Sequence, residues 1–283
     1  MHENNIKDNM EKSTKRTPLY KHRTFTDKFS DTAIFVCACW KPLLRILSTV
    51  LIPLCLLQTA CDAANMDKLF GFPSELLCSS FLQLMGSLFV IITVYAMMTV
   101  YNKCSEDGLS ECANLNSISA SQLYAAAKPQ MQSVCKILCS IVLLCAIAAV
   151  LTVAIAMSAG AMIGTFNGNE KDIAVVCVTL ALLLLLALPF WVLAVPAYAL
   201  DGLGFRTGLV RAIHCGFGTW GGIVAIMTVF TVGGMAVALP FALLPPYAGG
   251  FVSSYIIYIV QAVELVALGY QYGHAKAKLG LAE

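Results

Sequence analysis

Charged residues are scarce in this chain, and their scarcity excludes most soluble folds. Asp, Glu, Lys and Arg make up 12% of the 283 residues, whereas apolar residues make up 59% and the mean hydropathy is +0.78. Soluble globular domains usually carry about 25% charged residues and about 45–50% apolar residues. The composition therefore predicts an integral membrane protein.

The sequence also lacks the residue patterns that carry most enzyme chemistry. We find no Ser/His/Asp arrangement, no phosphate-binding glycine loop, no paired carboxylates in an apolar stretch and no nucleic-acid signature. His2, His22 and His274 lack metal-ligand spacing, as do Cys104 and Cys112. Most of the twelve cysteines lie in apolar stretches, where cysteine acts as a small apolar residue. We expect no enzyme, no cofactor, no metal and no nucleic-acid partner.

Six long apolar stretches are present instead. A helix needs about 20 apolar residues to cross about 30 Å of hydrocarbon. The stretches that reach this length are residues 41–60, 75–101, 134–165, 173–200, 218–244 and 251–272. They predict an all-α, polytopic bundle of six transmembrane helices in one domain, 25–275. We expect a disordered cytoplasmic tail at 1–24 and a short cytoplasmic tail at 276–283.

The basic residues give the bundle a direction. Sixteen of the eighteen Lys and Arg residues fall on one side of the six stretches, and only Lys68 and Lys171 fall on the other. Loops rich in Lys and Arg stay in the cytoplasm. Both termini are therefore predicted to be cytoplasmic, which agrees with an even number of spans. Cys61 and Cys78 would then lie near the outer ends of adjacent spans, where a disulfide is one alternative and two free thiols are the other.

An internal repeat is a further prediction. Each outward span follows a short amphipathic stretch that opens with a good N-cap residue, Asp27, Ser121 or Thr207. The repeated unit would be an interfacial helix, an outward span and an inward span, covering 25–102, 119–200 and 205–272. The alternative is that any helix entering a bilayer tends to have an amphipathic lead and an aromatic anchor.

Three segments carry a family resemblance. They are FTDKFSDTAIFVCACWKPLLRILSTVLIPLCLLQ at the first span, YALDGLGFRTGLVRAIHCGFGTWGGI at the fourth-to-fifth junction, and Gln271-Tyr272-Gly273-His274. The chain resembles a family of uncharacterised bacterial six-span integral membrane proteins. More distantly, it is similar to the membrane domain of some glycerophosphoryl diester phosphodiesterases. The resemblance implies a bacterial cytoplasmic (inner) membrane and no established activity, and no segment here is long enough for the catalytic barrel.

Glu264 is the strongest candidate for a functional side chain. It lies about thirteen residues into the last span, and Gln261 is one turn earlier on the same face. A carboxylate at that depth costs about 2.5–3.5 kcal/mol to insert, so it usually faces a cavity or a partner. The two side chains predict an ion, proton or substrate contact within the bundle. The alternative is a structural Glu264, paired with Arg45 or Lys136 or lying close to the lipid headgroups.

Two further sequence features can be explained either by a function or by helix packing and solvation alone. Arg206, Arg211 and His214 on the third amphipathic stretch are candidate contacts for lipid headgroups or a cytoplasmic partner, although a solvated polar face is the simpler interpretation. Pro and Gly in spans four and five are typical of interrupted transporter helices and also of close helix packing, which we favour.

Two functions follow from these patterns. The first is a non-enzymatic membrane protein that acts through partner or lipid contacts. The second is a small permease or a lipid or solute transporter with a site near Glu264. The transporter predicts a cavity lined by Glu264, Gln261 and other polar residues such as Gln83 or Gln58. A packed centre with Glu264 in a salt bridge would favour the first function.

Overall fold

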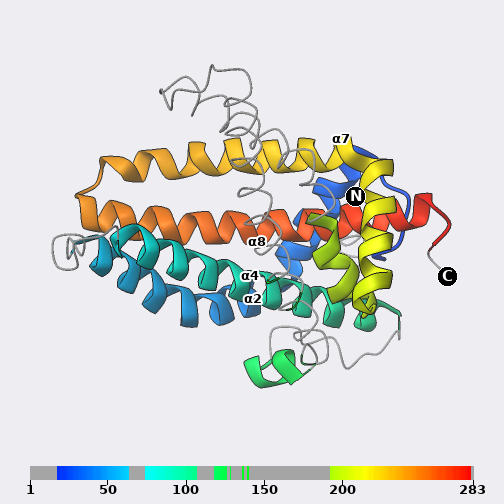
Figure 1. The fold of residues 1–283 in the computed structure, drawn as a ribbon, viewed down its shortest axis with the longest axis horizontal. Helices are drawn as coiled ribbons and strands as arrows, with labels where there is room; N and C mark the ends of the chain where they lie inside the picture. Colours follow the sequence, from blue (N-terminus) through cyan, green and yellow to red (C-terminus); the bar gives the residue numbers. More distant parts are fainter. Residues whose placement is uncertain are drawn as a thin grey trace, which may run out of the picture. The chain divides into compact units, whose positions relative to one another are not determined.

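All regular secondary structure in the described residues is helical. The computed structural model describes residues 18–63, 74–106, 118–125, 128, 136, 139 and 192–281. The long elements are α2 (Phe25–Ala63), α4 (Ser74–Glu106), α7 (Phe205–Ala238), the 3₁₀ helix η2 (Leu239–Leu243) and α8 (Pro246–Lys278) (Figure 1). A shorter apolar helix spans Val192–Asp201. Helices α2, α4, α7 and α8 are each long and apolar enough to cross a membrane. The all-α fold and the multi-pass character are confirmed to that extent.

Four of the six predicted spans lie in these helices. Residues 41–60 belong to α2, 75–101 to α4 and 251–272 to α8, while 218–244 runs through α7 and η2. The 3₁₀ turn begins just before Pro240, which cannot supply an amide hydrogen to an α-helix. The predicted span 134–165 lies outside the described residues except at residues 136 and 139. The predicted span 173–200 also lies outside them, except for 192–200, which is helical.

Helix α2 begins with a reciprocal capping interaction, although not at the predicted residue. The Thr24 amide donates to Asp27 Oδ2 at 2.9 Å, and the Asp27 amide donates to Thr24 Oγ1 at 3.2 Å. Thr24 is thus the N-cap and Asp27 lies in the first turn, where its charge also favours the helix dipole. Ser119 and Gln122 repeat the arrangement at the second amphipathic stretch, where Ser121 was predicted. The predicted caps, Asp27 and Ser121, therefore lie three and two residues after the observed ones.

The chain divides into two compact units. One contains Met1–Pro129 and Gly221–Glu283, and the other contains Gln130–Trp220. Helix α7 leaves helical geometry at Thr219 (φ −139°, ψ 20°), next to this boundary. The predicted junction between the third amphipathic stretch and its span falls at the same place. Helix α2, in contrast, continues from Phe25 to Ala63 although it contains Pro42 and Pro53.

The core of the first unit is built by α2, α4 and α8. Each of these helices packs against the other two (Figure 1). Their fully buried apolar side chains include Leu47 and Leu51 from α2, Val94 and Met97 from α4, and Val266 and Ala267 from α8. Polar contacts join the same helices away from their ends: Ser48 Oγ lies 2.6 Å from the Tyr255 hydroxyl, and the Tyr258 hydroxyl donates to the Gln83 carbonyl oxygen at 3.4 Å.

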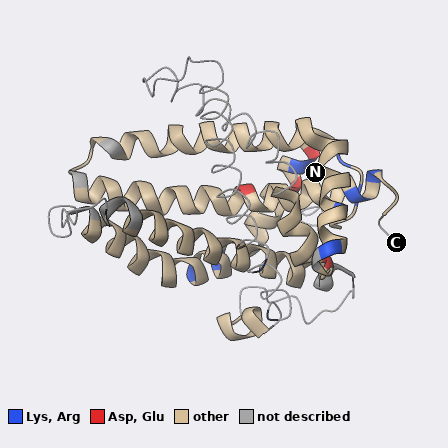
Figure 2. Ribbon diagram, viewed as in Figure 1, with Lys and Arg blue, Asp and Glu red and all other residues tan. Residues whose placement is uncertain are grey.

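The segment before α2 also belongs to this unit. Residues 18–24 contact α4 and α8, although the sequence predicts that they belong to a disordered tail. Leu19 lies 4% exposed and its amide donates to Asn102 Oδ1 at 3.4 Å. We call residues 18–24 the strap. Charged residues gather at the strap, the start of α2 and the end of α8, while the long apolar part of α8 contains a single acidic residue (Figure 2).

Candidate functional site

Glu264 lies near the middle of α8. At 1.5 Å per residue it is about 27 Å from the helix start at Pro246 and about 21 Å from the helix end at Lys278. Its side chain is partly exposed within the described structure. The helix flanking it is apolar, so in a bilayer this carboxylate would lie in or close to the hydrocarbon region.

A cavity of about 630 Å³ lies beside Glu264. Helices α4, α7 and α8 and the turn η2 form its wall. The polar side chains that line it are Gln83, Ser87, Thr231, Ser253, Gln261 and Glu264. The larger apolar side chains that line it are Phe230, Met235, Leu239, Ile257 and Val260. Its volume falls within the range of about 300–1,000 Å³ that is typical of small-molecule sites.

The structure brings both predicted side chains to this cavity. Ser87 Oγ donates to Gln261 Oε1 at 3.3 Å, which fixes the amide of Gln261 against α4. Gln83 lines the cavity as expected. Gln58 does not line the cavity. Its side-chain amide donates to Ser79 Oγ at 3.3 Å, where α2 ends and α4 begins. Ser87 was not predicted, because a lone serine in an apolar run carries no signal of its own.

Glu264 has no ion-pair partner among the described residues. It takes part neither in the ion pair of Arg23 with Asp31 nor in that of Arg211 with Asp201. The predicted alternative, a salt bridge from Glu264 to Arg45 or Lys136, is therefore absent from the described part of the chain. A carboxylate in an apolar wall is costly unless it is compensated. This arrangement can bind a cation or accept a proton.

The three candidate interfacial residues lie on the first turns of α7, in the second unit. Arg211 Nη1 donates to Asp201 Oδ2 at 3.2 Å, and the Asp201 side chain is 4% exposed. Arg206 and His214 are exposed. Arg211 thus joins two helix ends within its own unit.

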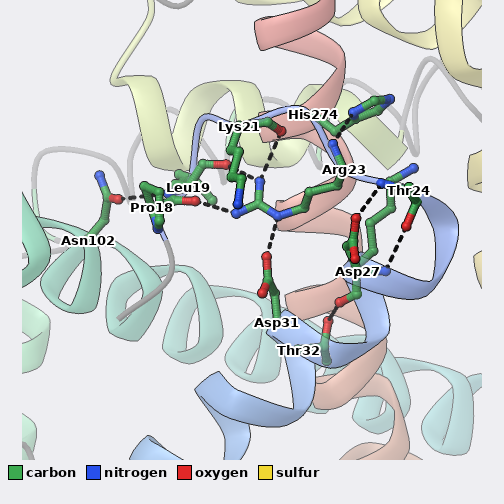
Figure 3. Close-up of polar contacts among 11 residues, drawn as sticks. Pro18, Leu19, Lys21, Arg23, Thr24, Asp27, Asp31, Thr32, Asn102 and His274 are labelled. Carbon is green, nitrogen blue, oxygen red and sulfur yellow. Dashed lines mark hydrogen bonds and ion pairs between the residues drawn. The ribbon is translucent and has the colours of Figure 1, made fainter. Parts of the chain in front are cut away.

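A second polar cluster surrounds Arg23 in the strap (Figure 3). The guanidinium is 1% exposed; its Nε donates to Asp31 Oδ2 at 2.5 Å, and its Nη1 donates to the Leu19 and Lys21 carbonyl oxygens at 2.7 and 3.3 Å. Its Nη2 donates to the Pro18 carbonyl oxygen. The guanidinium also lies over the Tyr270 ring, 4.7 Å from the centroid. Three of these hydrogen bonds hold backbone carbonyl groups and one holds the Asp31 carboxylate, which indicates a structural role.

His274 anchors the same strap to α8. The Arg23 amide donates to His274 Nδ1 at 3.0 Å, so this nitrogen carries no proton. Lys276 Nζ lies 4.0 Å from the centroid of the Tyr20 ring. The sequence predicts no metal-ligand role for His274 and does not predict its contact with Arg23. The only local signal was the Thr24-x-x-Asp27 pattern, which marks a helix start and hence an ordered approach to it.

None of the described His, Cys, Asp and Glu side chains form a group of three or more that could hold a metal ion. The site near Glu264 is thus a carboxylate, two amides and hydroxyl groups on an apolar wall. Comparisons with protein-family models, curated proteins and solved structures found no match to this chain.

Proposed function

We propose that this chain is a multi-pass membrane protein that binds a cationic amphiphile in the cavity beside Glu264, as a small lipid or solute permease would. The single observation that carries the proposal is the carboxylate of Glu264, which lies on the wall of a cavity of about 630 Å³ and has no ion-pair partner among the described residues. A permease requires such a site within the membrane, at the interface of its helices.

The chemistry of the wall defines the ligand. Glu264 favours a positively charged group, because a cation compensates a carboxylate that has no described partner. Gln83 and Gln261 offer hydrogen bonds beside it. The remaining wall, including Phe230, Met235 and Ile257, favours an apolar tail. We therefore expect an alkylammonium-like molecule with one tail, whose head lies at Glu264.

Photolabelling tests this ligand class. The purified full-length protein in lipid vesicles is exposed to a dodecylammonium probe that carries a diazirine in its tail, and labelled peptides are identified by mass spectrometry. We expect labels on the cavity-lining segments of α7 and α8, strong loss of labelling in Glu264→Gln, and retention in Glu264→Asp. The control is the same diazirine on dodecanol, which lacks the charge. Equal labelling by both probes, or labelling unaffected by Glu264→Gln, would refute recognition of the cation.

The proposed architecture has six spans with both termini in the cytoplasm. Element lengths support the similarity of the first and third predicted repeats, 25–102 and 205–272. Helix α2 has 39 residues, and so do α7 and η2 together, while α4 and α8 have 33 each. The first and second amphipathic stretches share the same local capping arrangement, Thr24 with Asp27 in the first and Ser119 with Gln122 in the second. The bacterial inner membrane is the location that the sequence resemblance favours.

The second candidate is a non-enzymatic factor that acts through lipid or partner contacts. The exposed Arg206 and His214 on α7 favour it, since a basic face can bind anionic headgroups. Native mass spectrometry with phosphatidylglycerol tests it. Loss of bound lipid in Arg206→Ala, with unchanged labelling at Glu264, would favour this function over the permease.

A further inference from the structure

Two cysteines meet where α2 ends and α4 begins. Cys61 Sγ and Cys78 Sγ lie 3.4 Å apart, although seventeen positions separate the residues in the sequence. Both side chains are partly buried. A second contact holds the same two helix ends together, because Gln58 Nε2 donates to Ser79 Oγ at 3.3 Å. The cysteines are therefore held side by side by the packing of the helices.

The remaining step to a covalent bond is short. A disulfide has a sulfur–sulfur distance of about 2.05 Å, so the two sulfurs need to approach by roughly 1.3 Å. A small side-chain rotation at each cysteine supplies such a movement without separating the helices. By contrast, Cys55 lies fully buried on α2, more than one turn earlier in the helix.

The position of the pair relative to the basic residues also matters. Cys61 lies near the end of α2 farthest from Arg23, Lys28 and the strap. If the basic end faces the cytoplasm, as proposed above, the two thiols face the oxidising side of the membrane. Disulfides persist on that side because no glutathione or thioredoxin system reduces them there.

We propose that Cys61 and Cys78 form a disulfide that ties α2 to α4 at the outer face. A thiolate of the pair attacks the disulfide of an oxidant, such as a thiol–disulfide exchange protein, and forms a mixed disulfide. The second thiolate then displaces the oxidant from that intermediate. One S–S bond forms in the chain and the S–S bond of the oxidant breaks. The chain loses two electrons and two thiol protons, and the oxidant takes up both electrons and both protons to become a dithiol. The proposal rests on the proposed orientation and is independent of the ligand at Glu264.

The bond would close the connection between α2 and α4. Closing a loop restricts the unfolded chain, so the oxidised protein should be more resistant to heat than the reduced one. It would also fix the outer ends of two helices that pack against α8, and so support the wall of the cavity from one side.

Differential alkylation in cells tests the disulfide. A full-length variant keeps only Cys61 and Cys78, with the other ten cysteines replaced by alanine or serine. Cells are quenched with N-ethylmaleimide, and the protein is denatured, reduced and tagged with a polyethylene-glycol maleimide. We expect two tags after reduction and none without it. The matched control keeps Cys55 and Cys78 instead and should gain no reduction-dependent tag.

A second measurement covers the case in which this variant folds poorly. Peptides from the wild-type chain, alkylated on lysis, are analysed by mass spectrometry before and after reduction. The proposal expects a cross-linked peptide that contains both Cys61 and Cys78 and separates on reduction, together with a fall of several degrees in the unfolding temperature. Complete alkylation of both thiols before reduction, in both experiments, would overturn the disulfide.

Discussion

At the scale of single residues, the strap depends on a glycine. The Leu19 carbonyl oxygen approaches Gly273 so closely that a Cβ there would overlap it. The same oxygen accepts a hydrogen bond from Arg23 Nη1 at 2.7 Å, so it cannot move away without a further loss. We predict that Gly273→Ala lowers the free energy of unfolding by about 1–3 kcal/mol, as other overpacked positions do.

Thermal unfolding of the detergent-solubilised protein measures this change. The matched control is Gly250→Ala in the same helix, because no neighbouring atom lies within 4 Å of the Cβ that would be added there. Gly250→Ala should leave the unfolding temperature unchanged or raise it slightly, since alanine favours the helix over glycine. Equal effects of the two substitutions would mean that the strap does not pack on α8.

The protonation of His274 gives the strap a dependence on pH. His274 lies in the polar last turns of α8, beyond Tyr272. Burial lowers its pKa from 6.5 to about 4, and neighbouring positive charges act in the same direction, namely those of Lys28, His22, Lys278 and Arg23. The neutral ring accepts the Arg23 amide hydrogen bond, whereas the protonated ring would lose this role at Nδ1.

A lowered histidine pKa fixes the sign of the effect. The unfolded chain binds a proton near pH 6.5 and the folded chain only near pH 4, so stability is full above about pH 6.5 and declines as the pH falls towards 4. We predict a falling unfolding temperature over this range in the wild type and a shallower fall in His274→Gln. Identical slopes in the two proteins would show that His274 is not the titrating group.

At the scale of elements, the cavity depends on a close approach of α7 to α8. A Cβ on Gly234 would lie 3.0 Å from Val260 Cγ1, while no atom of the described residues lies within 4 Å of the Cβ position on the adjacent Gly233. Gly234 and Val260 both line the cavity. A leucine at Gly234 therefore has to push the helices apart or fill the cavity, and a leucine at Gly233 does neither.

The pair gives a matched prediction. Gly234→Leu should abolish photolabelling by the alkylammonium probe and lower stability by about 1–3 kcal/mol. Gly233→Leu should retain labelling and most of the stability. Labelling that survives in Gly234→Leu would mean that the probe binds elsewhere on the protein.

Element boundaries show what the sequence could predict. Long apolar runs located α2, α4, α7 and α8, because the length of an apolar helix is a local property. Glu264 could be predicted as a candidate because an acidic residue is rare in such a run. Gln261 could be predicted because it lies one helical turn earlier on the same face. The sequence could not predict Ser87 as the partner of Gln261, because that contact depends on how α4 packs against α8.

The strap was missed for the same reason. Its sequence is polar and resembles a tail, and its order comes from partners up to 251 positions away, such as His274 for Arg23. The carbonyl groups that surround the guanidinium become acceptors only after the backbone has turned around it. The local composition of the strap therefore does not predict such long-range contacts.

At the scale of the whole molecule, topology is the first prediction. The distribution of Lys and Arg predicts that Lys68 and Lys171 lie outside and that both termini lie in the cytoplasm. A membrane-impermeant amine reagent added to intact cells should label these two lysines and spare Lys276 and Lys278. Labelling of Lys68 or Lys171 only in inverted vesicles would reverse the proposed orientation and remove the basis for an outer disulfide.

The central claim is that Glu264 lies in an accessible cavity within a membrane bundle, and substituted-cysteine accessibility tests it most directly. Glu264→Cys is placed on a cysteine-free background in lipid vesicles and treated with a small cationic thiosulfonate. The control is Val266→Cys on the same helix, whose native side chain is 0% exposed. We predict that Cys at 264 reacts and is protected by the alkylammonium probe, while Cys at 266 stays unmodified. No reaction at position 264 from either side of the membrane would contradict the cavity and, with it, the proposed function.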